Sequence, residues 1–417
     1  ISIRPVVPEG CSWHPRAFGP FFALKGETML ITHVHLVPVC GVEIPDGFLR
    51  TEGRRIAALG PMQELPAPAA GEEVVDGKGG WLLPGLVDIH SHLGMFGDGM
   101  GVEGDDGNEI ADPVTPQLRA IDAVNPLDRG FSEALDYGVT TVVTGPGSAS
   151  PISGQSAAMK TFGCCVDDMV LNPALAMKFA LGENPKGTYA PRSQAPTTRM
   201  ATAALIREEL YRAKRYLEDL ERYEHDTEDE LDPPEYDAKS EALLPVLKRE
   251  MAVHIHAHRA DDIFTAVRLI GEFSLRGVVI HATEGHLIAE RFAGFGIPVV
   301  CGPVIGSRDK PELVSLSRET PALLAHAGVK VALCTDHPEL PQEFLMLSAA
   351  LCHREGMSRA EALRAVTLTP AEIVGLDHRI GSLAPGKDAD LVLYPRDPLS
   401  GLERPVSVFL DGKQVRS

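Results

Sequence analysis

Residues 84–92 read Pro-Gly-Leu-Val-Asp-Ile-His-Ser-His, a short apolar run that ends in two histidines. In an extended strand, residues two apart project from the same face, so His90 and His92 point in one direction. At the carboxyl end of a barrel strand that direction is inward, where the strand ends converge on the active site. Two imidazoles held together form half of a metal site. This spacing alone is common by chance, so other strand ends must supply the remaining ligands.

Apolar, β-branched runs recur through the middle of the chain, with helical patterns between most of them. They cover residues 86–89, 140–143, 174–180, 251–255, 278–280, 297–300 and 329–333, and a less obvious run at 155–161 brings their number to eight. Hydrophobic strands that alternate with helices indicate a parallel sheet covered by helices. The pattern therefore predicts an α/β fold, a (β/α)8 TIM-type barrel, in preference to an open doubly wound sheet.

The two ends of the chain read as short strands separated by turns. Strands are expected at residues 30–37, 42–44, 48–51, 55–59, 389–394 and 406–410, and Asp411-Gly412 is a hairpin turn signal. We predict three parts: an N-terminal extension or leader at 1–28, a small β-sandwich domain formed from both chain ends at 29–82 and 380–417, and a metal-binding barrel at 83–379.

Composition narrows the classes of partner. The 417 residues include 39 Lys and Arg against 58 Asp and Glu, a net charge of −19. Nucleic acids and membrane surfaces are polyanions that select basic faces, so we expect neither as a partner, and no apolar run is long enough to span a membrane. Seven scattered cysteines without CxxC spacing indicate reduced thiols and a cytoplasmic protein. An acidic stretch at 218–237 is expected to be a solvated loop after a helix at 200–217.

Three more of the expected strands end in metal-ligating residue types. His254, His256 and His258 share one face of the fifth run, with His256 nearest its end, His281 ends the sixth run, and Asp336 ends the eighth. A single histidine or aspartate at a strand end is common by chance, but four strand ends that all carry such residues are hard to explain as coincidence. The sequence therefore predicts a metal centre at the carboxyl rim of the barrel.

These motifs resemble those of the amidohydrolase superfamily of metal-dependent hydrolases, and most closely its imidazolonepropionase-related branch. The resemblance covers nearly the whole chain from Met29. It rests on GLVDIHSH at 85–92, the histidines of the fifth and sixth strands, TDHP at 335–338 and GSLAPGKDADLV at 381–392. It implies a (β/α)8 barrel, one or two divalent metal ions, usually zinc, and hydrolysis of a C–N bond.

By position, the resemblance implies that His90, His92 and Asp336 are ligands of one metal and His256 and His281 are ligands of a second. In binuclear members a fourth-strand lysine, carboxylated by CO2, bridges the two cations, and Lys178 holds that place. An unmodified ammonium inside a dry barrel is costly. Glu183 as a direct ligand, in a site with different metal occupancy, is the alternative, and Lys160 on the preceding strand is a weaker rival.

The resemblance also implies roles in catalysis. Asp336 would pass a proton from the metal-activated water to the departing amine, and His281 would ligate metal or contact substrate when one ion is bound. We expect a small-molecule substrate, first a dipeptide or N-acyl amino acid. A mononuclear deaminase or cyclic-amidine/imidazolone hydrolase and a non-catalytic assembly protein are the alternatives. A homo-oligomer is the default expectation. The candidate substrate-binding residues are His258, His286, His337, Arg192, Arg199 and Arg308.

Overall fold

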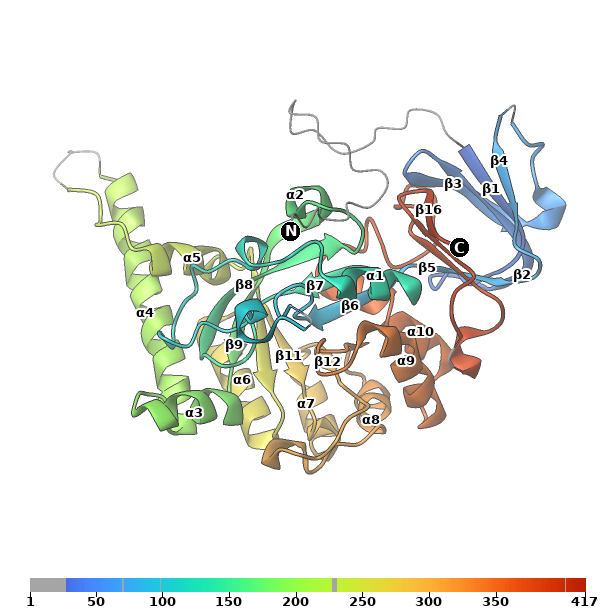
Figure 1. Ribbon diagram of the computed structural model, residues 1–417. Coiled ribbons are helices and arrows are strands. Elements are labelled where there is room, and N and C mark those ends of the chain that lie inside the picture. Colours follow the sequence, from blue (N-terminus) through green and yellow to red (C-terminus); the bar gives the residue numbers. More distant parts are fainter. Residues whose placement is uncertain (1–27, 70, 98, 227–230, 402) are drawn as a thin grey trace, which may run out of the picture.

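The computed structural model describes residues 28–69, 71–97, 99–226, 231–401 and 403–417. Two sheets organise these residues. One has the strand order β13-β12-β11-β10-β9-β8-β7-β6, and the other has the order β16-β15-β14-β5-β1-β2-β3, with β4 paired to β1. Figure 1 shows the first sheet in the middle of the molecule and the second at one end. The extension predicted at 1–28 lies outside the described residues except for Thr28, which begins β1.

The eight expected barrel strands all form, in the expected order. They are β6 (Leu86–Ser91), β7 (Val139–Thr144), β8 (Ile152–Lys160), β9 (Val170–Ala180), β10 (Ala252–Ala257), β11 (Gly277–His281), β12 (Val299–Cys301) and β13 (Val331–Leu333). The first and last strands meet just beyond their ends. The backbone N–H of Asp336 donates to the carbonyl oxygen of His90 (3.1 Å), and that of His92 donates to the carbonyl oxygen of His337 (2.8 Å). The predicted barrel is confirmed.

One strand runs against the predicted direction. β8 pairs antiparallel with β7 and with β9, whereas the other neighbouring strands of this sheet pair parallel. Connection length explains the reversal, because residues 145–151 alone join β7 to β8, and a parallel crossover takes about a dozen residues or more. Residues 161–169, with the short helix α2 (Val166–Met169), return the chain to β9. The barrel is therefore mostly parallel rather than eight repeated β/α units.

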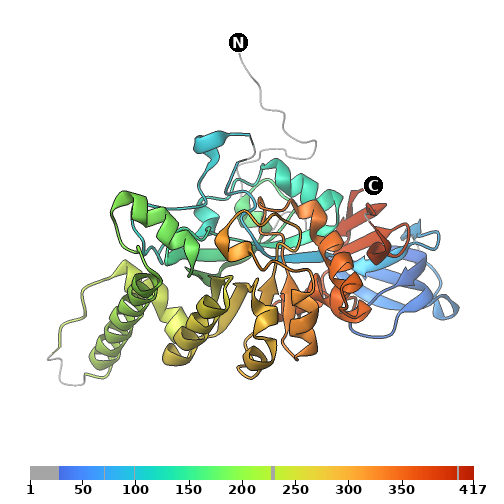
Figure 2. The same cartoon turned by 90° about the horizontal axis from the view of Figure 1, so that it is seen from below.

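Figure 2 shows a row of helices, drawn from olive green through yellow to orange, along one side of the sheet. Ten helices in the described residues lie around the barrel. They are α1 (Arg129–Asp136), α3 (Glu183–Tyr189), α4 (Arg199–Glu224), α5 (Ala238–Leu247), α6 (Ala260–Phe273), α7 (Ala289–Ala293), α8 (Thr320–His326), α9 (Leu345–Arg354), α10 (Arg359–Ala365) and α11 (Leu368–Ile373). None in the described part of the chain is long and apolar enough to cross a membrane.

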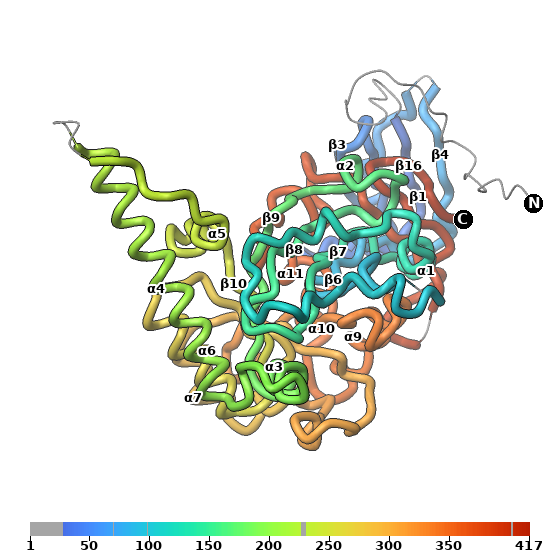
Figure 3. The backbone as a smooth tube through the Cα atoms, turned by 60° about the vertical axis from the view of Figure 1, so that its left-hand side comes forward, coloured from blue at the N-terminus to red at the C-terminus, as the bar shows by residue number. Residues whose placement is uncertain are grey.

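Helix α4 confirms the helix expected at 200–217 and continues to Glu224. Its residues Ile206, Leu210 and Ala213 are buried, three or four positions apart, so one face packs on the barrel. Its far end extends away from the rest of the molecule (Figure 3). Residues 227–230 of the predicted acidic loop lie outside the described residues.

Strands from both chain ends form the second sheet, as expected. They are β1 (Thr28–Leu36), β2 (Ile44–Glu52), β3 (Arg55–Pro61), β4 (Glu73–Asp76), β5 (Trp81–Pro84), β14 (Leu391–Tyr394), β15 (Ser407–Leu410) and β16 (Lys413–Arg416). β5 pairs antiparallel with β14, which joins the two ends of the chain. Asp411 and Gly412 have φ values of 51° and 78°, as a two-residue hairpin turn requires.

The separate strand predicted at 42–44 does not form. Residues 40–43 make an irregular connection in which the Val42 side chain is 85% exposed, and β2 begins only at Ile44. An exposed valine without a strand partner gives the extended conformation no packing energy. The division of the chain into domains at residues 82 and 380 stays a prediction.

Lys160 lies at the junction between the two sheets. Its Nζ contacts Asp390, Asp388 Oδ2 (3.2 Å) and Asp411 Oδ1 (3.5 Å), and its side chain is 5% exposed. Burial lowers the pKa of Lys160, but the carboxylates of Asp390, Asp411 and Asp388 together outweigh it and raise that pKa above its usual value. Because β8 is reversed, Lys160 faces the strands of the second sheet rather than the carboxyl rim of the barrel.

Candidate metal centre

The predicted ligands meet at the carboxyl rim of the barrel. They are His90 and His92 at the end of β6, His256 on β10, His281 at the end of β11, and Asp336 after β13. His258, predicted to bind substrate, lies beside His256 and His281 just beyond β10. Asp336 Oδ1 lies 3.2 Å from Nε2 of His90 and 3.2 Å from Nε2 of His92. Side chains far apart in the sequence are thus brought within reach of one another.

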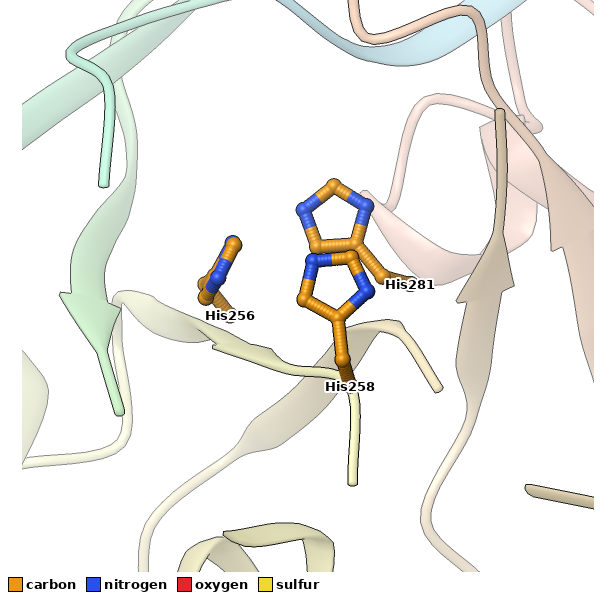
Figure 4. Close-up of side chains that lie close together, drawn as sticks. All are labelled: His256, His258 and His281. Atoms are coloured by element: carbon orange, nitrogen blue, oxygen red, sulfur yellow. The ribbon is translucent and has the colours of Figure 1, made fainter. Parts of the chain in front are cut away.

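The donor atoms fall into two groups of a size that could hold an ion. One contains His90, His281 and Asp336, the other contains His256, His258 and His281, and within each group one donor atom per residue lies within 4.8 Å of the others. Figure 4 shows the second group, in which the rings of His258 and His281 stack at 4.4 Å and the ring of His256 lies at 76° to both of them. His281 belongs to both groups, so the two positions are adjacent.

Four of the rings are fixed through Nδ1, which turns Nε2 toward the centre. These contacts join Nδ1 of His92 to the Gly145 oxygen (2.6 Å), His281 to the Gly302 oxygen (2.7 Å), His256 to Ser148 Oγ (2.9 Å) and His258 to Thr283 Oγ1 (2.7 Å). A carbonyl oxygen only accepts, so Nδ1 of His92 and His281 carries the proton and their Nε2 keeps a free lone pair. Metal-ligating histidines are usually held in this way.

Burial disfavours the protonated form of four of these imidazoles. It is the main cause that lowers the pKa of His90 to about 3 and that of His258 to about 4, and it holds the pKa values of His256 and His281 well below 6.5. Burial raises the pKa of Asp336, but the neighbouring histidines, led by His281, outweigh it and hold that pKa well below its usual range. Imidazoles together with a carboxylate are a donor set that suits zinc.

Three buried donor atoms at the centre have no hydrogen-bond partner among the described residues. They are Nε2 of His256, Nε2 of His281 and Oε1 of Glu312. A buried polar atom without a partner costs about 1–3 kcal/mol, and such atoms are rare in native proteins. A shared divalent cation would satisfy all three at once. The residues present therefore fit a metal.

Lys178 lies beside the first group. Its side chain is completely buried on β9, and its Nζ is 3.1 Å from His90 Nε2. It pairs with His254 on β10, which places it one step deeper in the barrel than His256. Burial lowers the pKa of Lys178 to about 8, against the opposing charge of Asp336. This position places Lys178 next to a proposed ligand of the first cation, and both its bridging role and its carboxylation stay predictions.

The other predicted site residues each have partners of their own around the rim. Glu183 Oε2 accepts a hydrogen bond from the Glu312 N–H (3.4 Å). Among the arginines, Arg199 pairs with Asp262 (3.0 Å), Arg308 donates to the Leu316 oxygen (2.7 Å), and Arg192 donates to the Thr188 oxygen. Of the two histidines, His286 contacts Thr320 Oγ1 through Nδ1 (2.8 Å), and the His337 N–H donates to Thr335 Oγ1 (3.1 Å). Their roles in substrate binding stay predictions.

Two of the predicted ligands adopt a strained backbone. His281 and Asp336 have φ values of 75° and 57°, and Ala282 has a φ of 46°. A side chain other than glycine in this left-handed region costs about 1 kcal/mol or more, and such residues cluster at functional sites. At both strand ends the chain thus turns sharply while His281 and Asp336 stay in the interior of the barrel.

Sequence reasoning missed Asp88, which ties the first strand to the last. Asp88 is completely buried on β6 and accepts hydrogen bonds from Thr335 Oγ1, the Thr335 N–H (3.2 Å) and the His90 N–H (3.2 Å). Burial raises the pKa of Asp88 to about 7. It therefore positions the backbone beside two proposed ligands, His90 and Asp336. An acidic residue inside an apolar strand was the signal that could have found it.

Glu312 was also missed, and it stands beside the second group. It comes from a single 3-10 turn (Pro311–Leu313) in the connection between β12 and α8. Its Oε1 lies 3.7 Å from Nε2 of both His256 and His258. Nothing in its sequence spacing marks it, because it lies ten residues or more beyond the strand end at Cys301.

Comparison with known proteins identifies the family. Residues 81–415 match the Amidohydrolase family. A solved amidohydrolase from Thermotoga maritima is 38% identical, with a TM-score of 0.88 over 93% of this chain and 99% of that one. Amidohydrolase tasK of Hapsidospora irregularis is 30% identical over 379 residues, 84% of this chain, which spans only 38% of that protein's length. The imidazolonepropionase of Aromatoleum aromaticum is 27% identical over 424 residues, 88% of this chain and 91% of that protein.

The chain belongs to the amidohydrolase family and is related to its imidazolonepropionase branch. It is a hydrolase that acts on C–N bonds.

Proposed function

We propose that this protein is a metal-dependent hydrolase that cleaves an amide C–N bond of a small polar molecule, first a dipeptide or an N-acyl amino acid. One observation carries the proposal. Imidazoles and one carboxylate from the ends of β6, β10, β11 and β13 converge on two adjacent groups, and two of their buried donor atoms, Nε2 of His256 and Nε2 of His281, have no hydrogen-bond partner.

The proposed ligands are His90, His92 and Asp336 for one divalent cation, and His256 and His281 for a second, with Lys178, carboxylated by CO2, between the two. Zinc suits these nitrogen and oxygen donors best. Bound divalent cations lower the pKa of water toward neutrality and polarise a carbonyl oxygen. The Nδ1 contacts of His92 and His281 hold these two rings in fixed orientations with Nε2 available to a cation.

Asp336 is the proposed proton carrier. Its Oδ1 lies 3.2 Å from Nε2 of both His90 and His92, and its lowered pKa keeps it ionised. As a carboxylate beside the proposed cation it would accept a proton from the attacking water. It then donates this proton to the departing nitrogen, because an amide nitrogen leaves poorly unless protonated. With a single ion bound, His281 is free to contact the substrate instead.

A cyclic C–N bond is the second candidate. The imidazolonepropionase relative matches this chain over 91% of its own length, and its name describes a hydrolase of a ring. The same carboxylate and histidines would open a cyclic amide or amidine with one metal ion, and a ring deaminase would use them similarly. A non-catalytic barrel is disfavoured, because every position at which we propose a metal ligand carries a residue type that can bind a metal.

We also propose that the protein is cytoplasmic and a homo-oligomer. All six cysteines in the described residues are free thiols, which suits a reducing compartment. Closed symmetric oligomers are common among soluble enzymes.

Metal analysis and hydrolysis assays on His90→Ala and Asp336→Asn test the proposal, with the exposed His378→Ala as control. We expect hydrolysis to fall at least about 100-fold in both variants, since acid–base groups contribute 10²–10⁴-fold, and His90→Ala to lose bound metal. The control should keep metal and rate. Full activity in both variants would end the proposal. Parallel assays with dipeptides, N-acyl amino acids and imidazolones separate the two candidates.

A further inference from the structure

Glu312 places one anchored and one free carboxylate oxygen at the centre. Its side chain is 1% exposed, and its Oε2 accepts a hydrogen bond from the Glu183 N–H (3.1 Å). Glu183 returns the contact by accepting from the Glu312 N–H (3.4 Å). These two hydrogen bonds fix the turn at Pro311–Leu313 to the start of α3, so the turn cannot move away from α3 without breaking both of them.

The free oxygen faces two imidazoles at a distance that suits a shared ion. Glu312 Oε1 lies 3.7 Å from Nε2 of His256 and 3.7 Å from Nε2 of His258. These separations are too long for hydrogen bonds. Two ligands about 2.1 Å from a tetrahedral zinc ion are about 3.4 Å apart, close to what is observed. A buried carboxylate oxygen without a hydrogen bond is otherwise costly.

The ring of His258 is also fixed in orientation beside the second group. Its Nδ1 contacts Thr283 Oγ1 at 2.7 Å, and its ring stacks on His281 with 5° between the planes. One donor atom of His258 thereby lies within 4.8 Å of the donors of His256 and His281 (Figure 4). Neither the stacking nor the tether uses its Nε2.

We propose that Glu312 and His258 are direct ligands of the second divalent cation, together with His256 and His281. This inference rests on the proposed metal-dependent hydrolysis and deepens it. The second position then has an anionic ligand supplied by this chain alone. It should therefore fill with a zinc-type cation whether or not Lys178 is carboxylated.

The test measures metal content and affinity of the full-length protein for Zn²⁺, by elemental analysis and by competition with a chelator. Glu312→Gln removes the charge but keeps an acceptor for the Glu183 N–H, and His258→Gln removes the imidazole. Glu319→Gln, an exposed carboxylate in the same connection, is the matched control. We expect both site variants to bind the second Zn²⁺ at least about 100-fold more weakly, more than is usual for residues that only orient a ligand, while the control keeps the wild-type affinity.

Crystals of the Zn²⁺-loaded protein give an independent readout, an anomalous peak within about 2.2 Å of Glu312 Oε1 and His258 Nε2. Wild-type affinity and metal content in Glu312→Gln overturn the inference, and so does a variant that only lowers the melting temperature of the metal-free protein. In either case, loss of hydrolysis in His90→Ala leaves the proposed function standing. Full activity in that variant removes the proposed function itself.

Discussion

Lys160→Met should destabilise the protein by about 3–5 kcal/mol, the usual cost of removing one partner from a buried ion pair. Methionine keeps most of the side-chain volume but leaves Asp388, Asp390 and Asp411 close together without their shared cation. At 3.2 Å and an effective dielectric constant of about 20, the attraction to Asp388 alone is about 5 kcal/mol before desolvation is subtracted. The expected loss is a large part of the roughly 5–15 kcal/mol that stabilises a typical protein.

Urea denaturation followed by circular dichroism measures this loss, with the exposed Lys248→Met as a control that should change stability by less than about 0.5 kcal/mol. Adding Asp390→Asn to Lys160→Met should recover part of the loss, because one of the unpaired charges disappears. The raised pKa of Lys160 implies that its stabilisation is complete below pH 10.5 and is lost only as the pH rises through the folded-state value. A loss below about 1 kcal/mol, or a change in metal content, would refute the structural role.

Three other perturbations have definite expected results. In metal-free protein, burial lowers the pKa of Lys178 to about 8. The buried ammonium therefore reduces the free energy of unfolding by an amount on the order of 3 kcal/mol below pH 8, and this loss disappears as the pH rises toward 10.5. Lys178→Met should abolish this pH dependence of stability in urea titrations. Gly412→Ala should lower stability by about 1–3 kcal/mol, measured by thermal melting, because the new Cβ would lie 2.2 Å from the Gly53 oxygen at a φ of 78°. Chelation should lower the melting temperature and abolish hydrolysis, and added Zn²⁺ should restore both; an unchanged melting curve would argue against a bound metal.

The sequence predicts the barrel well because each strand is a buried run bounded by turns, and this pattern depends on local residues. All eight runs form strands at the expected places. The direction of β8 was not predicted, because burial is the same for a parallel and an antiparallel strand. Only the short connection at 145–151 distinguishes them, and a length rule applied there would have given the reversal.

The convergence of side chains on the candidate site was predictable for residues at strand ends and unpredictable for residues in loops. His90, His256, His281 and Asp336 are placed by strand geometry, so their convergence follows from the fold. Glu312 reaches the centre from an irregular connection whose path depends on tertiary contacts. The same limit explains why the partner of Arg199, a carboxylate on α6, was not foreseen.

The reversed β8 has a consequence for how this enzyme can acquire new specificities. The turn at 145–151 supplies Gly145 and Ser148, which hold the rings of His92 and His256. Lengthening this turn would release both histidines, so this sector of the rim is closed to insertions that reshape a pocket. The connection after β12, which runs from Gly302 to the start of α8 at Thr320, is fixed in a similar way at two points, because the Gly302 oxygen holds His281 and Glu312 lies beside His256 and His258. Variation in substrate choice among natural or engineered relatives should therefore concentrate between these two points or after Glu312, rather than at them.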